Sequence, residues 1–155
     1  MTKGCSDVVN AFEQTKAKVT IETRVKNGVN TERHELTVEG TIYNKEGTFV
    51  CTYDEQMDVG KVKTIVKISD ETATIIRNGA LSMRQQYVVN ERINGTYTLP
   101  YGGGVPLSMT TKATRVQLTW DGKRKGTITL AYDLWIQGEF TGTYNVTMKM
   151  EGVQT

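Results

Sequence analysis

One stretch of strict alternation, residues 60–68, limits how this chain can fold more than any other feature. In it, valine, threonine or isoleucine recurs at every second position, and the residues between are mostly lysine. One side therefore consists of Val62, Thr64, Val66 and Ile68, and the other of Lys61, Lys63, Ile65 and Lys67. A period of two is typical of a strand with one buried and one solvated face, whereas an amphipathic helix repeats every 3.6 residues. The stretch predicts a strand of an antiparallel sheet.

Similar alternation recurs along the chain between turns that contain glycine and asparagine. The 155 residues include 15 glycines and 2 prolines, and a hydrophobic fraction of 37% suits strands that show only one face to a core. The patterns predict about eight to ten strands within residues 15–152, preceded over residues 1–14 by a tail or a short helix. A sheet of this size avoids exposed edges by closing on itself. We therefore predict an all-β fold, a single closed antiparallel up-and-down barrel.

The first hairpin carries a specific turn signal. Asn27-Gly28 is typical of a two-residue hairpin turn. That turn would pair Ile21 with His34 on the inner face, and Glu22 with Arg33 on the outer face, where opposite charges attract. Because a slip of one residue would exchange the two faces, the match of apolar sides favours this register.

The same test predicts the other connections. Asn44–Gly47 is expected to form a four-residue loop, and odd-length loops are expected around Asp121–Lys123 and Gly138–Phe140. Asn94-Gly95 is expected to turn, and the glycine-rich segment Tyr101–Pro106 is expected to be a flexible connection or a lid over the barrel.

A second two-residue turn is predicted at Asn78-Gly79. It would place Arg77 and Arg84 on the outside of the barrel, where they could not hold a buried carboxylate. The inner face would then consist of Thr72, Thr74 and Ile76 on one strand and Leu81, Met83 and Gln85 on the next.

Charge and cysteine usage argue against several classes of function. The net charge is +2, with basic and acidic residues mixed along the chain, which argues against a nucleic-acid partner. Cys5 and Cys51 match no metal or redox spacing and are expected to be reduced thiols in a reducing cytosol. No apolar run is long enough for a transmembrane helix, and residues 1–14 lack the apolar region of a signal peptide. We expect a cytoplasmic protein with no membrane association and no cofactor.

Several segments resemble a known family. They are Val59–Ile68, Ile76–Val88, Gly126–Leu134 and Met148–Gly152. In these the chain is similar to the YwiB-like family of small, uncharacterised bacterial proteins, over roughly residues 15–152. The resemblance implies a calycin-like closed barrel, similar in shape to lipocalins and fatty-acid-binding proteins, in a cytoplasmic bacterial protein. It implies no activity and supplies no functional motif.

Catalytic and metal sites find little support in the sequence. Hydrolysis by a nucleophile needs a base in reach, and His34 is the one histidine of the chain. A pair of His34 with Cys51 is possible only if two different strands bring them to the same height. One histidine and two distant cysteines do not supply a zinc site. Asp54, Glu55 and Asp58 fall close together in the chain, but such loop carboxylates are usually solvated. We therefore lean against an enzyme.

The feature most suggestive of function is aromatic. Tyrosines from several strands are predicted to face inward, and buried hydroxyls need partners. Together with a histidine and a glutamine they would give an apolar interior a few polar groups, as in a site for a small molecule. The candidate ligand-binding residues are His34, Tyr53, Gln85, Tyr87, Tyr132 and Tyr144. The alternative is that the same rings fill the interior and leave no cavity.

We therefore expect a non-enzymatic barrel that binds a small, partly apolar ligand. The alternative is an interaction module that binds a protein or nucleic acid through the outer lysine row of Lys61, Lys63 and Lys67. Lysines on a solvated strand more often serve only to protect an edge, so this remains the second hypothesis. The sequence does not identify the ligand or the oligomeric state.

Overall fold

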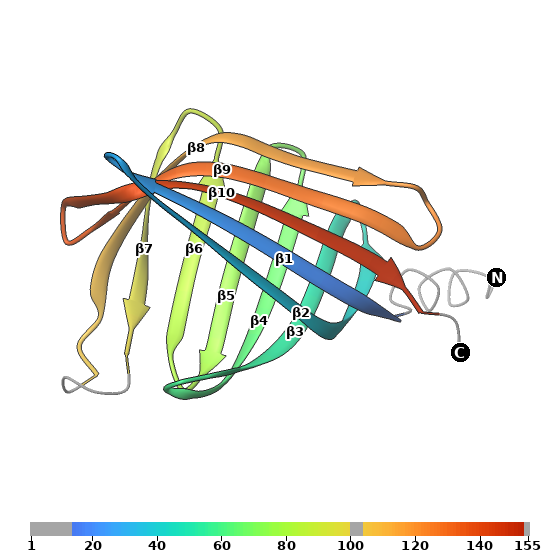
Figure 1. Cartoon of the computed structure of the whole chain (residues 1–155). Coiled ribbons are helices and arrows are strands. Elements are labelled where there is room, and N and C mark those ends of the chain that lie inside the picture. The colour runs from blue at the N-terminus through green and yellow to red at the C-terminus, as the bar shows by residue number, and fades with distance from the viewer. Residues whose placement is uncertain (1–13, 100–103, 154–155) are drawn as a thin grey trace.

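The computed structural model of the protein describes residues 14–99 and 104–153 and forms a closed barrel of antiparallel strands (Figure 1). The strands are β1 (Thr15–Asn27), β2 (Asn30–Lys45), β3 (Thr48–Met57), β4 (Gly60–Ser69), β5 (Thr72–Gly79), β6 (Ser82–Val88), β7 (Arg92–Thr98), β8 (Leu107–Trp120), β9 (Lys125–Ile136) and β10 (Glu139–Gly152). Each pairs with its neighbours in sequence, and β1 pairs with β10 to close the barrel. The predicted all-β, up-and-down closed barrel is confirmed.

Two predictions fall largely or partly outside the described residues. These are the tail or helix over Met1–Gln14, of which only Gln14 is described, and the lid over Tyr101–Pro106, of which only Gly104–Pro106 are described. The first strand begins at Thr15 and the last ends at Gly152, at the same end of the barrel (Figure 1).

The strand β4 behaves as its alternation predicts. Its lysines are exposed, and its other side is buried to 2% exposure or less, with Val62, Thr64, Val66 and Ile68 in the interior. Inward residues of the other strands meet this face to form one continuous core. Eight strands enclose a space that side chains just fill, so a barrel of ten has a wider interior.

The predicted registers were wrong by two residues. The first turn consists of Gly28-Val29, so Ile21 pairs with Leu36 and His34 with Thr23. The predicted contact between Glu22 and Arg33 exists nevertheless, as a diagonal one, with the Arg33 Nε 2.5 Å from the Glu22 Oε2. Because two is the period of a strand, the shift leaves inward residues inward.

Other connections are offset in the same way. The β2–β3 turn consists of two residues, Glu46-Gly47, and the β8–β9 connection is the five residues between Trp120 and Gly126, an odd length as predicted. The β9–β10 turn is two residues long, and a bulge between Phe140 and Gly142 changes the phase instead of an odd loop. In the β8–β9 loop the Asp121 carboxylate accepts hydrogen bonds from three successive backbone N–H groups, at 2.7, 2.9 and 3.1 Å.

The predicted inner face of β5 was wrong, and the error changes which residues line the interior. The last β5–β6 pair is Arg77 with Met83, so the connection is longer than two residues and its odd length reverses the faces of β5. Gly79 stays beside β4, with φ at 122°, and a Cβ there would collide with the Lys61 carbonyl. Arg77 and Ile75 therefore point into the barrel, whereas Arg84 is exposed as predicted.

Asn94-Gly95 is not a turn but lies within β7, which corrects the prediction. The glycine is needed there because the Gln85 side chain occupies the place of a Cβ, and the Arg84 carbonyl oxygen would lie only 2.5 Å from it. Asn90, with φ at 65°, makes the turn between β6 and β7 instead.

The barrel wall opens where β2 separates from β3. Backbone pairing of β2 with β3 ends at Gly40 and Tyr53, although β2 extends back to Asn30 and β3 onward to Met57. The stretches that do not pair with each other, residues 30–39 of β2 and 54–57 of β3, lie within the described residues. The β1–β2 hairpin therefore leaves β3 and opens the wall near the turns that join β3 to β4 and β5 to β6.

Candidate functional site

An interior cavity of about 290 Å³ lies in the half of the barrel toward this opening. Its wall is mainly aliphatic and methionine side chains, contributed by nearly every strand. Five tyrosines and one arginine supply most of its polar groups: Tyr53, Tyr87, Tyr97, Tyr132, Tyr144 and Arg77. At the other end the Phe49 and Trp120 rings pack against each other, 5.2 Å between centroids, beside the buried Met150.

The four tyrosines predicted to face inward all lie on the wall of this cavity. The Tyr87 and Tyr132 centroids are 4.7 Å apart in a tilted pair, and Tyr132 stacks on Tyr144 at 5.3 Å with planes 4° apart. Tyr53, Tyr87 and Tyr132 are at most 8% exposed, whereas Tyr144 is partly buried. Burial raises the pKa of Tyr87 to about 12 and the pKa of Tyr132 well above its usual value, so these hydroxyls are protonated at neutral pH.

Arg77 is the charged residue among the described residues that line the cavity. Its Nε is buried and has no hydrogen-bond partner, and no carboxylate of the described residues lies within ion-pair distance. Its charge opposes the rise that burial causes in the pKa values of Tyr53, Tyr87 and Tyr132. The Arg77 guanidinium therefore interacts electrostatically with Tyr53, Tyr87 and Tyr132.

A hollow of about 270 Å³ occupies the opening between β2 and β3. It shares Ile21, Thr23, Tyr53 and Arg77 with the interior cavity, so the two spaces adjoin at these residues. Its outer rim consists of His34, Glu35, Leu36, Glu55 and Met57. We refer to this hollow as the mouth.

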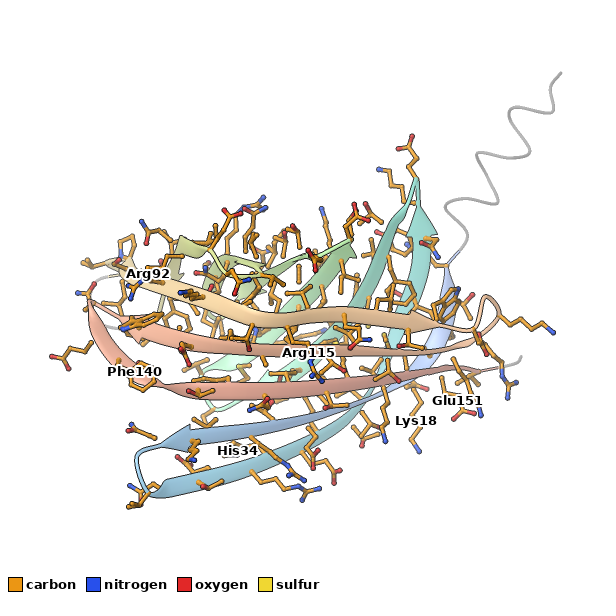
Figure 2. All side chains as sticks on the ribbon, turned by 90° about the horizontal axis from the view of Figure 1, so that it is seen from above. Lys18, His34, Arg92, Arg115, Phe140 and Glu151 are labelled. Carbon is orange, nitrogen blue, oxygen red and sulfur yellow. The ribbon has the colours of Figure 1, made fainter. Side chains whose placement is uncertain are left out.

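His34 lies outside the interior, contrary to the prediction. It has the inward phase, but it sits on the part of β2 that has left β3, and its side chain is 67% exposed (Figure 2). Its Nε2 is 3.6 Å from the Glu32 carboxylate. The histidine therefore belongs to the rim of the mouth.

Gln85 is buried as predicted, but it does not line the cavity. Backbone pairing of β6 with β7 stops at Arg84 and Thr96, and the Gln85 amide continues the connection. Its Nε2 donates to the Ile93 carbonyl at 2.9 Å and to the Thr111 Oγ1 at 2.8 Å. Gln85 is therefore part of the wall.

Cys51 is fully buried in β3 between Ile42 and Val66. Burial raises the pKa of its thiol to about 12, so it is protonated and a poor nucleophile at neutral pH. The structure places it in the closed part of the wall and His34 on the rim, so it does not bring them together as a pair. Within residues 14–99 and 104–153, no three side chains are arranged to hold a metal ion.

The lysine row lies on the outer face of β4 as predicted, with all three side chains exposed. Its charge is partly balanced, because the Lys61 Nζ is 3.6 Å from the Asp54 carboxylate and Lys63 pairs across the strands with the same residue. Lys67 lies between Val50 and Thr74. In the described part of the chain no helix is long and apolar enough to cross a membrane.

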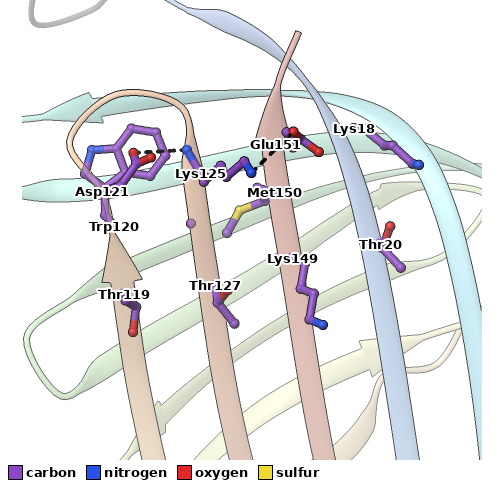
Figure 3. Close-up of a pocket in the computed structure, with 11 residues that line it drawn as sticks. Lys18, Thr20, Thr119, Trp120, Asp121, Lys125, Thr127, Lys149, Met150 and Glu151 are labelled. Carbon is purple, nitrogen blue, oxygen red and sulfur yellow. Dashed lines mark hydrogen bonds and ion pairs between the residues drawn. The ribbon is translucent and has the colours of Figure 1, made fainter.

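A larger hollow, about 500 Å³, lies on the outer face of β1, β8, β9 and β10 (Figure 3). It is open to solvent and lined by threonines and charged residues. Glu151 there is 3.8 Å from the Lys125 ammonium and 3.7 Å from the Arg124 guanidinium. Because this hollow is open to solvent, whereas the interior cavity is enclosed by mostly buried side chains, the interior cavity is the stronger candidate site.

Sequence reasoning missed Arg77 and Tyr97. Arg77 was misplaced because Ile75 and Ile76 allow either face of β5 to be the apolar one. Tyr97 lay in a segment read as turn and loop. A tyrosine two residues after Gly95 in a short alternating segment was the available signal.

Comparison with known proteins agrees with this architecture. The model of a family described as "Domain of unknown function (DUF1934)" matches residues 19–148. The uncharacterized beta-barrel protein YwiB of Bacillus subtilis (strain 168) is 30% identical over 140 residues, which are 90% of this chain and 96% of that protein. The crystal structure of the same B. subtilis protein superimposes with a TM-score of 0.82, covering 94% of this chain and 97% of that one. The resemblance seen in the sequence is confirmed: the chain belongs to the DUF1934 family of YwiB-like β-barrel proteins.

Proposed function

We propose that this protein is a cytoplasmic, non-enzymatic carrier or sensor that binds one small, partly apolar molecule inside the barrel, as lipocalins do. The observation that carries the proposal is the cavity of about 290 Å³ with several tyrosine hydroxyls and one arginine in an otherwise largely apolar wall. Small-molecule sites combine such a wall with a few polar groups that orient the ligand.

The size of the cavity limits the ligand. A dry protein cavity of about 150 Å³ holds benzene, which has six non-hydrogen atoms. By that measure the interior accepts a molecule of about twelve non-hydrogen atoms. The mouth adds a route from solvent, because it adjoins the cavity at Tyr53 and Arg77.

Several features favour binding over catalysis. The buried thiol of Cys51 has a pKa of about 12, and the tyrosine hydroxyls are protonated at neutral pH. His34, the histidine available as a base, is on the rim rather than beside a nucleophile. Hydroxyls of this kind orient a ligand by hydrogen bonds.

The rival function is binding of a macromolecule through Lys61, Lys63 and Lys67. The exposure of the three lysines supports it, and the partial neutralisation of the row by Asp54 weakens it.

Native mass spectrometry of the purified protein, before and after denaturation, is the first test. A co-purifying small molecule is expected. Titration with 3-phenylpropan-1-ol, a neutral probe of about the right size, is the second test, and binding is expected to be abolished by Val146→Phe, which fills the cavity. The matched control is Val29→Phe, since Val29 is 99% exposed in a turn. If no molecule co-purifies and the probe does not bind the wild-type protein, the proposal is wrong, and the double variant Lys61→Glu/Lys63→Glu then tests the outer face.

A further inference from the structure

The position of Arg77 indicates the charge of the ligand, which the tyrosines do not. A buried polar group without a partner is rare in native structures, because burying it without a hydrogen bond costs free energy. Arg77 places a cation, with its Nε buried and unpaired, where the cavity meets the mouth. The Arg77 Nε therefore requires a hydrogen-bond acceptor, and none of the described residues supplies one.

The surroundings of Arg77 define what that partner is. A guanidinium carries only donors, and the protonated phenol groups of Tyr53 and Tyr87 are able to donate, whereas the Tyr132 hydroxyl donates toward Tyr87. No aspartate or glutamate is among the described residues that line the cavity. A group of donors around one positive charge is complementary to an anion, and a carboxylate matches the planar fork of a guanidinium.

The acidic residues near this position lie farther out. Glu35 and Glu55 line the mouth, and Glu32 on β2 acts electrostatically on Tyr144. Glu55 shares the mouth with Arg77, but the two are not among the ion pairs of the described residues. A carboxylate that reaches Arg77 must pass these groups, so removal of the Glu55 charge favours its binding.

We propose that the ligand is a small monocarboxylate whose apolar, ring-containing body lies against the Tyr87–Tyr132–Tyr144 cluster and whose carboxylate binds Arg77. This inference rests on the proposed function and names the chemical class of its ligand. Aromatic rings pack favourably in tilted or offset geometry at centroid separations such as those of this cluster. The apolar wall leaves no second place inside for a charge.

Isothermal titration of the wild-type protein with three probes of one shape tests the inference. The probes are 3-phenylpropanoate, 3-phenylpropan-1-ol and 3-phenylpropylammonium. The carboxylate is expected to bind at least about tenfold more tightly than the alcohol, which is the contribution of one hydrogen bond between charged partners. The ammonium is expected not to bind.

Variants then locate the interaction. Arg77→Met is expected to abolish the preference for the carboxylate while the alcohol still binds, and Arg84→Met, an exposed arginine on the next strand, is expected to change nothing. Glu55→Gln is expected to tighten binding of the carboxylate. If Arg77→Met does not fold, Arg77→Lys keeps the charge but loses the fork and is expected to retain only part of the preference.

The outcomes separate the two proposals. If the alcohol binds as tightly as the carboxylate, or if Arg77→Met keeps the preference, the anionic ligand is refuted and the proposed function stands. If no probe binds the wild-type protein and nothing co-purifies with it, both are refuted. If Glu55→Gln lowers the stability and leaves carboxylate binding unchanged, Glu55 is the partner of Arg77 and the inference is refuted.

Discussion

The connection that Gln85 makes between β6 and β8 leads to a quantitative prediction. Thr111 is fully buried on β8, and its Oγ1 accepts a hydrogen bond from the Gln85 Nε2 at 2.8 Å and donates one to the Gln86 carbonyl at 3.0 Å. The change Thr111→Val replaces this hydroxyl with a methyl group of nearly the same size. It therefore removes the hydrogen bond that the hydroxyl donates, together with one of the three acceptors shared by the two hydrogens of the Gln85 Nε2, without opening a cavity.

The structure sets the size of the effect. Each hydrogen bond contributes about 1 kcal/mol to stability, so the loss of the bond donated by Thr111 and of part of the shared one should lower the free energy of unfolding by about 1–2 kcal/mol. The Gln85 amide keeps its bonds to the Ile93 and Gln86 carbonyls, so no donor is left buried and unpaired, and a larger loss is not expected. With an unfolding entropy of about 2.1 cal/mol/K per residue, this loss corresponds to a fall in Tm of roughly 3–6 °C for a chain of this length.

Urea unfolding monitored by tryptophan fluorescence, together with calorimetry, measures both quantities. The matched control is Thr110→Val, which removes a hydroxyl from the next residue of β8, where the bond to Asn94 is exposed; a change under about 0.5 kcal/mol is expected. In the cycle with Gln85→Met, the two losses should not add, because both variants break the same bond. A Thr111→Val protein as stable as the control would show that this network does not hold β6 against β8.

Three further predictions test other parts of the fold. Gly95→Ala should lower Tm by more than 10 °C, because its Cβ would lie about where the Gln85 side chain is and 2.5 Å from the Arg84 carbonyl oxygen. The control Thr96→Ala, on the same strand, should change Tm by less than about 2 °C. Equal changes in Tm would mean that the backbone at Gly95 accommodates a Cβ at little cost. Stability should be nearly constant from pH 7 to about pH 8 and fall as the pH rises toward 12, because unfolding restores the ordinary pKa values of 9.0 for Cys51 and 10.0 for Tyr87 from about 12 in the fold, and deprotonation then favours the unfolded chain. Urea midpoints measured from pH 7 to 11 check this, and a flat profile would contradict it. Leu36→Trp, which narrows the mouth, should slow association of 3-phenylpropan-1-ol in stopped-flow measurements with little change in Kd; an unchanged rate would mean that ligands enter elsewhere.

The hairpin registers show what pattern matching in a sequence leaves undetermined. Matching apolar sides detects a slip of one residue, because that slip moves every side chain to the other face. It does not detect a slip of two, which preserves both faces, and four predicted connections were offset by that amount. The consequence for His34 was large. The true register places it two residues nearer the hairpin turn, on the part of β2 that has separated from β3, so it lies on the rim of the mouth and not in the interior.

The strand β5 shows a second limit. Its two adjacent isoleucines fit either face, so the length of the next connection decided the outcome. That length depends on Gly79, which remains paired with β4 after β5 and β6 have separated. The length of this connection turns Arg77 from the outer face to the inner one, and the proposed ligand class depends on Arg77.

The sequence by itself determined that the chain is all-β, that its sheet closes, and that Tyr53, Tyr87, Tyr132 and Tyr144 face inward. The strands and the inward rings follow from a period of two within each strand, which is local, and closure follows from the need of a sheet of this size to avoid exposed edges. Only the tertiary structure decided which rows of residues meet, where the wall opens, that a cavity remains, and that Arg77 rather than His34 lies at its edge. Those properties depend on register and connection length between strands, and contacts across the barrel set them.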